Sequence, residues 1–220
     1  GWRPSPLPAR ACRAPSPALT TDPALEERKR LRRELRARRR AIQGAERRRK
    51  GEQLARRVDA MRLLRPGRRI GLYLSTAEEI DTSALLALAL ERGCRVALPR
   101  VTSLRHDRMR FFDLEGKVGR GAFGILEPAG GRMRPARELD VIFMPLVGFD
   151  AGGNRIGMGR GFYDRHLAFR RHLLYWRRPL LVGLAYGVQQ VPALPHAPHD
   201  VPLDAIVTEY TSLRFVRRTP

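Results

Sequence analysis

Apolar residues in the first third of the chain recur at the spacing of an α-helix. They form two groups, within which the intervals are three, four or seven residues, so the side chains gather on one helical face. The positions are Leu31, Leu35 and Ile42, followed by Leu54, Val58 and Met61. The pattern predicts helical structure over residues 24–64, with interruptions or a joint between two helices at Gly44 and Gly51.

The pattern changes after residue 69, where short apolar runs alternate with helical segments. Helices are predicted from the capping sequence at residues 81–83 to Gly93, and again over residues 161–174. Strands are predicted at residues 70–74, 95–99, 109–113, 141–144, 180–185 and 206–207. This alternation predicts an α/β fold with a largely parallel sheet, in which ligands bind beyond the carboxyl ends of the strands.

The length of 220 residues is that of one domain with an extension. Residues 1–22 are rich in proline and show neither helical nor strand periodicity, so we expect a disordered extension there and a folded domain over residues 23–220. Two cysteines are too few for a disulfide scaffold, and the apolar runs are too short to span a membrane. We therefore expect a cytoplasmic protein with no membrane partner, and a monomer.

The chain carries 43 basic and 22 acidic residues, a formal net charge of +21. Most of the excess lies in residues 1–70, whose net charge is +15. Such a charge first suggests a nucleic-acid partner. The run from Arg28 to Arg40 contains no aromatic residue, however, and aromatic residues make up only 7% of the chain. An RNA-binding protein therefore remains the weaker alternative, and the basic helix is either a solvated face or a surface for small anions.

Three glycines alternate in the segment between the strand at 141–144 and the helix at 161–174. They are Gly157, Gly159 and Gly161. Glycine permits close backbone approach, so that successive amide groups and the following helix N-terminus are able to point at one anion. Arg155 and Arg160 add cationic groups suited to phosphate oxygens, and Asp164 is a candidate Mg²⁺ ligand. The spacing matches neither a Walker loop nor a dinucleotide fingerprint.

The whole block from Phe149 to Arg165, F-D-A-G-G-N-R-I-G-M-G-R-G-F-Y-D-R, resembles the signature of the 5-formyltetrahydrofolate cyclo-ligase family, also called methenyltetrahydrofolate synthetases. The likeness runs in order over residues 25–213. Further similar segments are residues 31–41, 79–82, 125–128, 139–145 and 202–208. The resemblance implies a single Rossmann-like domain preceded by a basic N-terminal helical region.

It also implies a reaction, the ATP- and Mg²⁺-dependent conversion of 5-formyltetrahydrofolate to 5,10-methenyltetrahydrofolate with release of ADP and phosphate. In this reaction the formyl oxygen attacks the γ-phosphate, N10 closes on the activated carbon, and phosphate leaves. The protein then mainly positions the reactants and stabilises charge. ATP is a cosubstrate, Mg²⁺ the cofactor, and the folate a mono- or polyglutamylated partner.

The resemblance assigns roles to particular residues. Those implied to be catalytic are Arg155, Arg160 and Tyr163. Those implied to bind ATP are Arg28, Lys29, Arg32, Arg155, Gly157, Met158, Gly159, Arg160, Gly161, Phe162 and Tyr163. Those implied to bind the folate are Arg32, Glu79, Met109, Phe123 and Tyr163. Asp164 and Asp204 are the implied Mg²⁺ ligands.

Three points stay open at this level. Either Arg28 or its neighbour Lys29 contacts ATP, and Met109 and Phe123 are as well explained by core packing as by ligand contact. Glu78 stands where many members of the family have glycine before the folate-recognising glutamate, so the geometry of the turn there is also open. A member of the family that binds its ligands without turnover is the third alternative, and the retained Glu79, Arg155, Asp164 and Asp204 argue against it.

Overall fold

The computed structural model describes residues 22–121, 124–171 and 178–215. Its core is an eight-stranded sheet in the order β12-β11-β10-β7-β1-β2-β3-β6. The five strands from β11 to β2 run parallel, while β12 is antiparallel to β11, β3 to β2 and β6 to β3. Their bounds are β1 (Arg69–Gly71), β2 (Arg95–Ser103), β3 (Arg108–Asp113), β6 (Met133–Arg134), β7 (Val141–Pro145), β10 (Leu180–Leu184), β11 (Ala205–Val207) and β12 (Ser212–Arg214).

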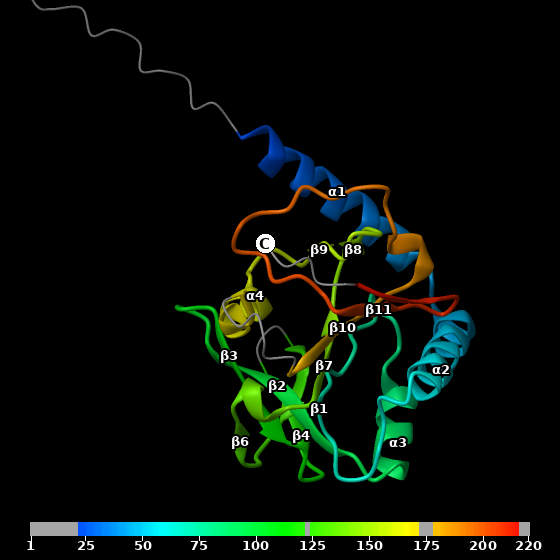
Figure 1. Ribbon diagram of the computed structural model, residues 1–220, viewed down its shortest axis with the longest axis vertical. Coiled ribbons are helices and arrows are strands. Elements are labelled where there is room, and N and C mark those ends of the chain that lie inside the picture. Colours follow the sequence, from blue (N-terminus) through cyan, green and yellow to red (C-terminus); the bar gives the residue numbers. More distant parts are fainter. Residues whose placement is uncertain (1–21, 122–123, 172–177, 216–220) are drawn as a thin grey trace, which may run out of the picture.

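The prediction of an α/β fold with a largely parallel sheet is confirmed, and the helices cover it from both sides (Figure 1). The helices are α1 (Pro23–Arg40), α2 (Gly44–Ala60), α3 (Ser83–Glu91) and α4 (Phe162–His166). The structure also contains the short 3-10 helices η2 (Ala136–Glu138), η3 (Ala168–Arg171) and η4 (Gly187–Gln189). The helix predicted over residues 161–174 is thus α4 followed by η3, and its last residues lie outside the described ranges.

The first helical region breaks where α1 ends and α2 begins, next to Gly44. The second predicted interruption is wrong, because Gly51 lies inside α2. Gly51 instead allows α2 to approach the backbone of Asp81, where a Cβ atom would meet the carbonyl oxygen at 2.6 Å. The chain enters α1 through Asp22, whose carboxylate accepts a hydrogen bond from the amide of Ala24 at 3.0 Å.

The central strand β7 shows why the sheet needs cover on both faces. Val141 and Phe143 pack with α2 and α3, whereas Ile142 and Met144 pack on the opposite face with residues of β3 and with Leu167, which follows α4. Because strand side chains alternate between the two faces of a sheet, a continuous apolar run indicates a strand that is buried on both faces.

A third, smaller apolar cluster fixes α1 over the carboxyl edge of the sheet. Leu31 and Leu35 of α1 pack against Val147 and Ile156. These two residues flank and end a small hairpin made of β8 (Gly148–Phe149) and β9 (Arg155–Ile156). A second two-stranded ribbon joins β4 (Val118–Arg120) to β5 (Leu126–Pro128). No helix among the described residues is long and apolar enough to cross a membrane.

Candidate functional site

The glycine loop (residues 157–161) leads into α4 beyond the carboxyl ends of the parallel strands, as the sequence predicts, but it starts from β9 and not directly from β7. Gly159 and Gly161 have φ angles of 106° and 65°, in the left-handed region that favours glycine, whereas Gly157 does not. The carbonyl oxygen of Gly157 accepts a hydrogen bond from Nε of Arg32 at 2.9 Å. The basic helix α1 and the glycine loop, 125 residues apart in the chain, therefore meet directly.

The hairpin before the loop is organised by Asp150, which sequence reasoning did not single out. One of its carboxylate oxygens accepts the amides of Gly152 and Asn154 at 2.9 and 3.0 Å. The other accepts the amide of Leu194 at 3.0 Å. Asp150 is buried, and its role is to hold the turn that leads into β9. The signal was present in the motif, since an aspartate followed by glycines and asparagine is typical of such turns.

The buried Arg155 and the partly buried Asp164 form an ion pair across the glycine loop. Nη2 of Arg155 lies 2.5 Å from Oδ1 of Asp164, and the same oxygen accepts the amide of Val201 at 3.1 Å. Nε of Arg155 has no hydrogen-bond partner among the described residues. The pair joins β9 to the first turn of α4, so the loop between them is closed at its base.

The second predicted metal ligand, Asp204, lies just before β11. Its carboxylate accepts the amide of Leu181 at 2.8 Å and pairs with the buried Arg170, whose Nη2 lies 3.0 Å away. Burial raises the pKa of Asp204, and the bond from Leu181 and the charge of Arg170 oppose this shift. Because Asp164 bonds to Val201, three residues before Asp204, the two carboxylates stand on neighbouring segments. The described residues contain no cluster of three or more acidic, histidine or cysteine side chains that would hold a metal without help from a ligand.

Glu79 belongs to a tight turn, the 76–79 turn. Its Oε2 accepts the amide of Thr76 at 2.9 Å, and its backbone carbonyl accepts bonds from Arg47 and Tyr186, both at 3.0 Å. The charge of Glu79 adds to burial in raising the pKa of Tyr163. Glu79 and Tyr163, both predicted to bind the folate, therefore lie in one neighbourhood.

The basic residues of α1 separate into two directions. Arg28 donates to the carboxylate of Asp200 and to the carbonyl of Pro195, each at 2.7 Å, and its charge helps burial lower the pKa of Arg32. Lys29 is 57% exposed and pairs with Glu26 on the outer side of the helix. Of Arg28 and Lys29, Arg28 is thus the residue that faces the rest of the protein, at the loop of residues 195–200.

Other predicted residues have different surroundings. Arg160 extends toward the β2–β3 hairpin, where its Nε lies 2.8 Å from the carboxylate of Asp107. Met109 is only 3% exposed and packs in the core, and Phe162 packs partly against the same cluster. Met158 is exposed. Phe123 lies outside the described residues.

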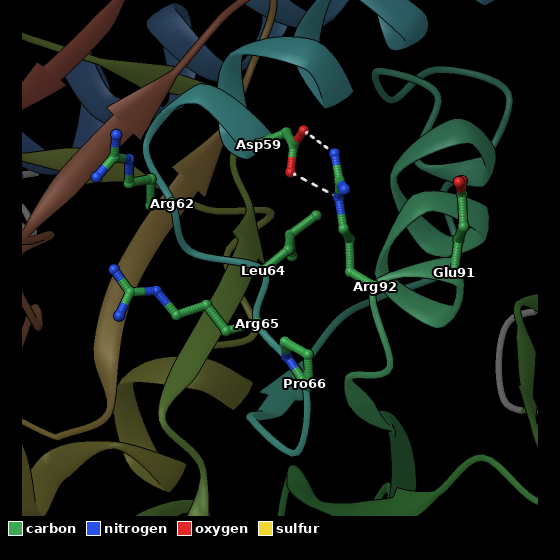
Figure 2. Close-up of a pocket in the computed structure, with 7 residues that line it drawn as sticks. All are labelled: Asp59, Arg62, Leu64, Arg65, Pro66, Glu91 and Arg92. Carbon is green, nitrogen blue, oxygen red and sulfur yellow. Dashed lines mark hydrogen bonds and ion pairs between the residues drawn. The ribbon is translucent and has the colours of Figure 1, made fainter.

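A hollow of about 440 Å³ lies away from this region (Figure 2). It lies between the segment that joins α2 to β1 and the end of α3, and an ion pair between Asp59 and Arg92 borders it at 2.7 Å. Its lining residues are Asp59, Arg62, Leu64, Arg65, Pro66, Glu91 and Arg92. It contains none of the residues that the sequence predicted to be functional.

The fold and the site define an α/β protein in which a glycine loop, a basic helix, a glutamate-bearing turn and two partly buried carboxylates lie at the carboxyl ends of the parallel strands. The model of the 5-formyltetrahydrofolate cyclo-ligase family matches residues 24–209. The chain belongs to this family, which is named for a ligase activity. The resemblance first noted in the glycine block is thereby confirmed.

Individual relatives agree with this assignment. The chain is 34% identical to the 5-formyltetrahydrofolate cyclo-ligase of Escherichia coli K12, over 79% of this chain and 96% of that protein. It is 31% identical to the protein of the same name from Mus musculus, over 81% and 92% of the two chains. The solved structure of Aquifex aeolicus 5,10-methenyltetrahydrofolate synthetase superposes with a TM-score of 0.74 at 29% identity, covering 88% of this chain and 95% of the other.

Proposed function

We propose that the protein converts 5-formyltetrahydrofolate to 5,10-methenyltetrahydrofolate at the expense of ATP, with Mg²⁺ as cofactor and with release of ADP and phosphate. The observation that carries this proposal is the convergence of four segments at one edge of the sheet. The contact of Arg32 with Gly157 brings α1 to the glycine loop. Arg39 of α1 lies 3.3 Å from Glu78 of the 76–79 turn and 3.9 Å from the sulfur of Met158 in the glycine loop, which brings the turn to the same place.

The glycine loop suits the phosphates of ATP. Its left-handed residues Gly159 and Gly161 leave the backbone unshielded by side chains, so that amide groups are accessible to phosphate oxygens. Arg28 and Arg32 approach from α1, and we infer that Arg28 rather than Lys29 contacts the nucleotide because Lys29 points outward. Arg155, rigidly paired at the base of the loop, supplies fixed positive charge.

The folate side rests on Glu79. A carboxylate held in a fixed turn is suited to accept hydrogen bonds from the N–H and amino groups of a pterin ring. Tyr163 lies close enough to sense the charge of Glu79, and burial keeps its hydroxyl protonated by raising its pKa. Arg32 stands between the two subsites through its bond to the glycine loop. The remaining candidates for packing on the pterin ring are Met109 and Phe123.

In the reaction, the protein orients the formyl oxygen of the folate toward the γ-phosphate of ATP. Arg155 and Arg160 are the groups proposed to stabilise the charge that develops during transfer, and Tyr163 is the proposed third catalytic residue. Phosphorylation turns the formyl oxygen into a good leaving group, so that N10 attacks the same carbon and phosphate departs. Holding both ligands at one edge of the sheet supplies the proximity that this sequence of steps needs.

The residues proposed to hold Mg²⁺ are Asp164 and Asp204. Their chemistry fits, since Mg²⁺ commonly binds one or two protein carboxylates and takes its other ligands from phosphates and water. Both carboxylates pair with arginines in this structure, Asp164 with Arg155 and Asp204 with Arg170. When bound, Mg²⁺ would neutralise charge on the phosphate oxygens.

The direct test combines purified protein, Mg²⁺, ATP and 5-formyltetrahydrofolate and follows the absorbance of the methenyl product. We expect a rise that requires both ATP and Mg²⁺. Folded protein that gives no ATP-dependent rise, while still binding the folate, would instead favour a member that binds without turnover. Size-exclusion chromatography tests the accompanying expectation of a monomer, and cell fractionation the expectation of a cytoplasmic location.

A further inference from the structure

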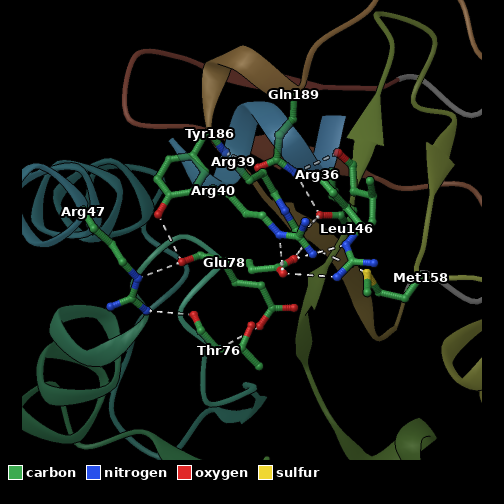
Figure 3. Close-up of polar contacts among 12 residues, drawn as sticks. Arg36, Arg39, Arg40, Arg47, Thr76, Glu78, Leu146, Met158, Tyr186 and Gln189 are labelled. Atoms are coloured by element: carbon green, nitrogen blue, oxygen red, sulfur yellow. Dashed lines mark hydrogen bonds and ion pairs between the residues drawn. The ribbon is translucent and has the colours of Figure 1, made fainter. Parts of the chain in front are cut away.

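The carboxylate of Glu78 lies among three guanidinium groups of α1 (Figure 3). Oε1 accepts from Nε of Arg40 at 2.7 Å and from Nη2 of Arg36 at 3.1 Å. Oε2 accepts from Nε of Arg36 at 3.2 Å and from Nη2 of Arg39 at 3.3 Å. We call these four residues the Glu78 cluster. Charge-assisted hydrogen bonds of this kind are the strong ones, and four of them fix one side chain.

Arg39 distinguishes this cluster from an ordinary surface ion pair. It is only 2% exposed, whereas a guanidinium is rarely buried without a partner because its desolvation is costly. Its Nη1 donates to the carbonyl of Leu146 at 3.0 Å, and its Nη2 lies 3.9 Å from the sulfur of Met158 in the glycine loop. Glu78 is the one carboxylate that pairs with Arg39 among the contacts of the described residues.

Glu78 also belongs to the 76–79 turn that carries Glu79. Within the turn, the amide of Glu79 donates to the carbonyl of Thr76 at 3.1 Å, and Oε2 of Glu79 accepts the amide of Thr76. The other side of the turn is held by Arg47 and Tyr186 through the carbonyl of Glu79. The Glu78 side chain is thus the contact that fixes this turn to α1.

We propose that Glu78 is a positioning residue for folate binding, which fixes the 76–79 turn to α1 and, through Arg39, to Met158 of the glycine loop. The proposal rests on the proposed function, since it assumes that Glu79 recognises the folate.

The test compares the wild type with Glu78→Gln and Glu78→Ala. The dissociation constant of 5-formyltetrahydrofolate is measured by calorimetry without ATP, and KM and kcat by the methenyl absorbance. Loss of a charge-assisted anchor is expected to raise the folate Kd and KM about tenfold in Glu78→Ala and less in Glu78→Gln. We expect kcat at saturating folate and the KM for ATP to change by less than about twofold, because neither reacting group is removed.

The matched control is Glu34→Gln. It also removes one negative charge, but from an exposed ion pair with Arg38 within α1. Its folate Kd and KM are expected to equal those of the wild type, because surface pairs contribute little. Circular dichroism and thermal unfolding establish that each variant is folded. If Glu78→Ala does not fold, Glu78→Gln still tests the proposal, because it keeps a hydrogen-bond acceptor and the side-chain volume.

An unchanged folate Kd in folded Glu78 variants would overturn the proposal. So would an equal loss in kcat and in both KM values, because that pattern is expected from general structural damage. Failure of the reaction is distinguishable: a wild type that binds the folate without turning it over contradicts the proposed function, while the ratio of folate Kd values still decides the role of Glu78. A wild type that does not bind the folate contradicts both.

Discussion

The 76–79 turn and the glycine loop face the same edge of the sheet, but different contacts hold them. The turn is fixed through side chains, with the Glu78 cluster on one side and Arg47 with Tyr186 on the other. The glycine loop is closed at its base by Arg155 and Asp164, while its exposed Met158 and Arg160 lie at the surface. A rigid turn suits recognition of a planar ring, whereas backbone amides in a glycine loop suit a polyphosphate.

The largest expected effect comes from breaking the base of the glycine loop. Asp164→Asn removes the charge that pairs with the buried Arg155 and a proposed Mg²⁺ ligand. We expect kcat to fall at least about 100-fold, a loss in the range for removing an electrostatic catalytic contact. Steady-state kinetics over a Mg²⁺ titration measures the effect. The control is Asp59→Asn, at the exposed pair with Arg92 away from the glycine loop, where a change below about twofold is expected. Near-wild-type turnover of Asp164→Asn would remove this residue from the site.

The second prediction concerns the pH dependence of the unfolding free energy, to which His166 contributes on the α4 side of the site. Burial, assisted by the charge of Arg110, lowers the pKa of His166 at the end of α4 to about 4, from an ordinary value of 6.5. The unfolded chain therefore takes up this proton at a higher pH than the folded protein, so stability is present above pH 6.5 and is lost as the pH falls toward 4. The loss from this group is on the order of 3 kcal/mol.

Urea unfolding of the wild type and His166→Phe between pH 7 and 4 measures this loss. The variant is expected to show a flatter dependence of its unfolding free energy on pH. The same replacement at His106, which is exposed on the β2–β3 hairpin, serves as the control. Parallel curves for wild type and His166→Phe would show that the histidine is not held neutral by burial.

The smallest expected effect concerns coupling within the Glu78 cluster. Glu78→Gly leaves Arg39 buried with reduced compensation, whereas Glu78→Gly combined with Arg39→Met removes both charges. We expect the double variant to be more stable than the sum of the single changes predicts, by about 1–2 kcal/mol. A double-mutant cycle of urea unfolding at pH 7 measures the coupling, and strict additivity would contradict it.

The pH dependence of this coupling sharpens the contrast with His166. The bonds from Arg36, and then those from Arg40, outweigh burial and lower the pKa of Glu78 to about 2, from an ordinary value of 4.5. The stabilisation is therefore complete above pH 4.5 and is lost only as the pH falls through about 2. The turn is thus expected to keep its anchor in the pH range where the burial of His166 already destabilises the α4 side.

Much of the fold was predictable because the parallel strands are short apolar runs with clear boundaries. Strands β2, β3, β7, β10 and β11 lie where these runs predicted them, and β1 is shorter than predicted. The sequence did not predict β6, β12 or the β4–β5 and β8–β9 ribbons. These strands have two or three residues each, too few for a period of two to be recognised. The proline-rich extension before residue 23 stays a prediction.

The site was predictable as a set of residues but not as a set of contacts. The motif identified the glycine loop and Asp164, whereas the pairing of Asp164 with Arg155 depends on how the hairpin folds back. Arg39 is the clearest case. It follows Leu31 and Leu35 at helical spacing, so the period placed it on the buried face, yet an arginine is ordinarily assigned to solvent. Only the positions of Glu78 and Leu146 in the fold explain its burial.

The close approach at Gly51 has a consequence for inherited variation. A methyl group at this position would meet the Asp81 carbonyl, and Asp81 holds Arg47, which in turn bonds to the carbonyl of Glu79. An alanine at residue 51 would therefore push Asp81 away from α2 and disturb the contacts of Arg47 with the 76–79 turn. It would do so without altering any residue of the proposed site. Such an allele would be expected to weaken the proposed folate contact of Glu79, although residue 51 lies inside α2 and outside the proposed site.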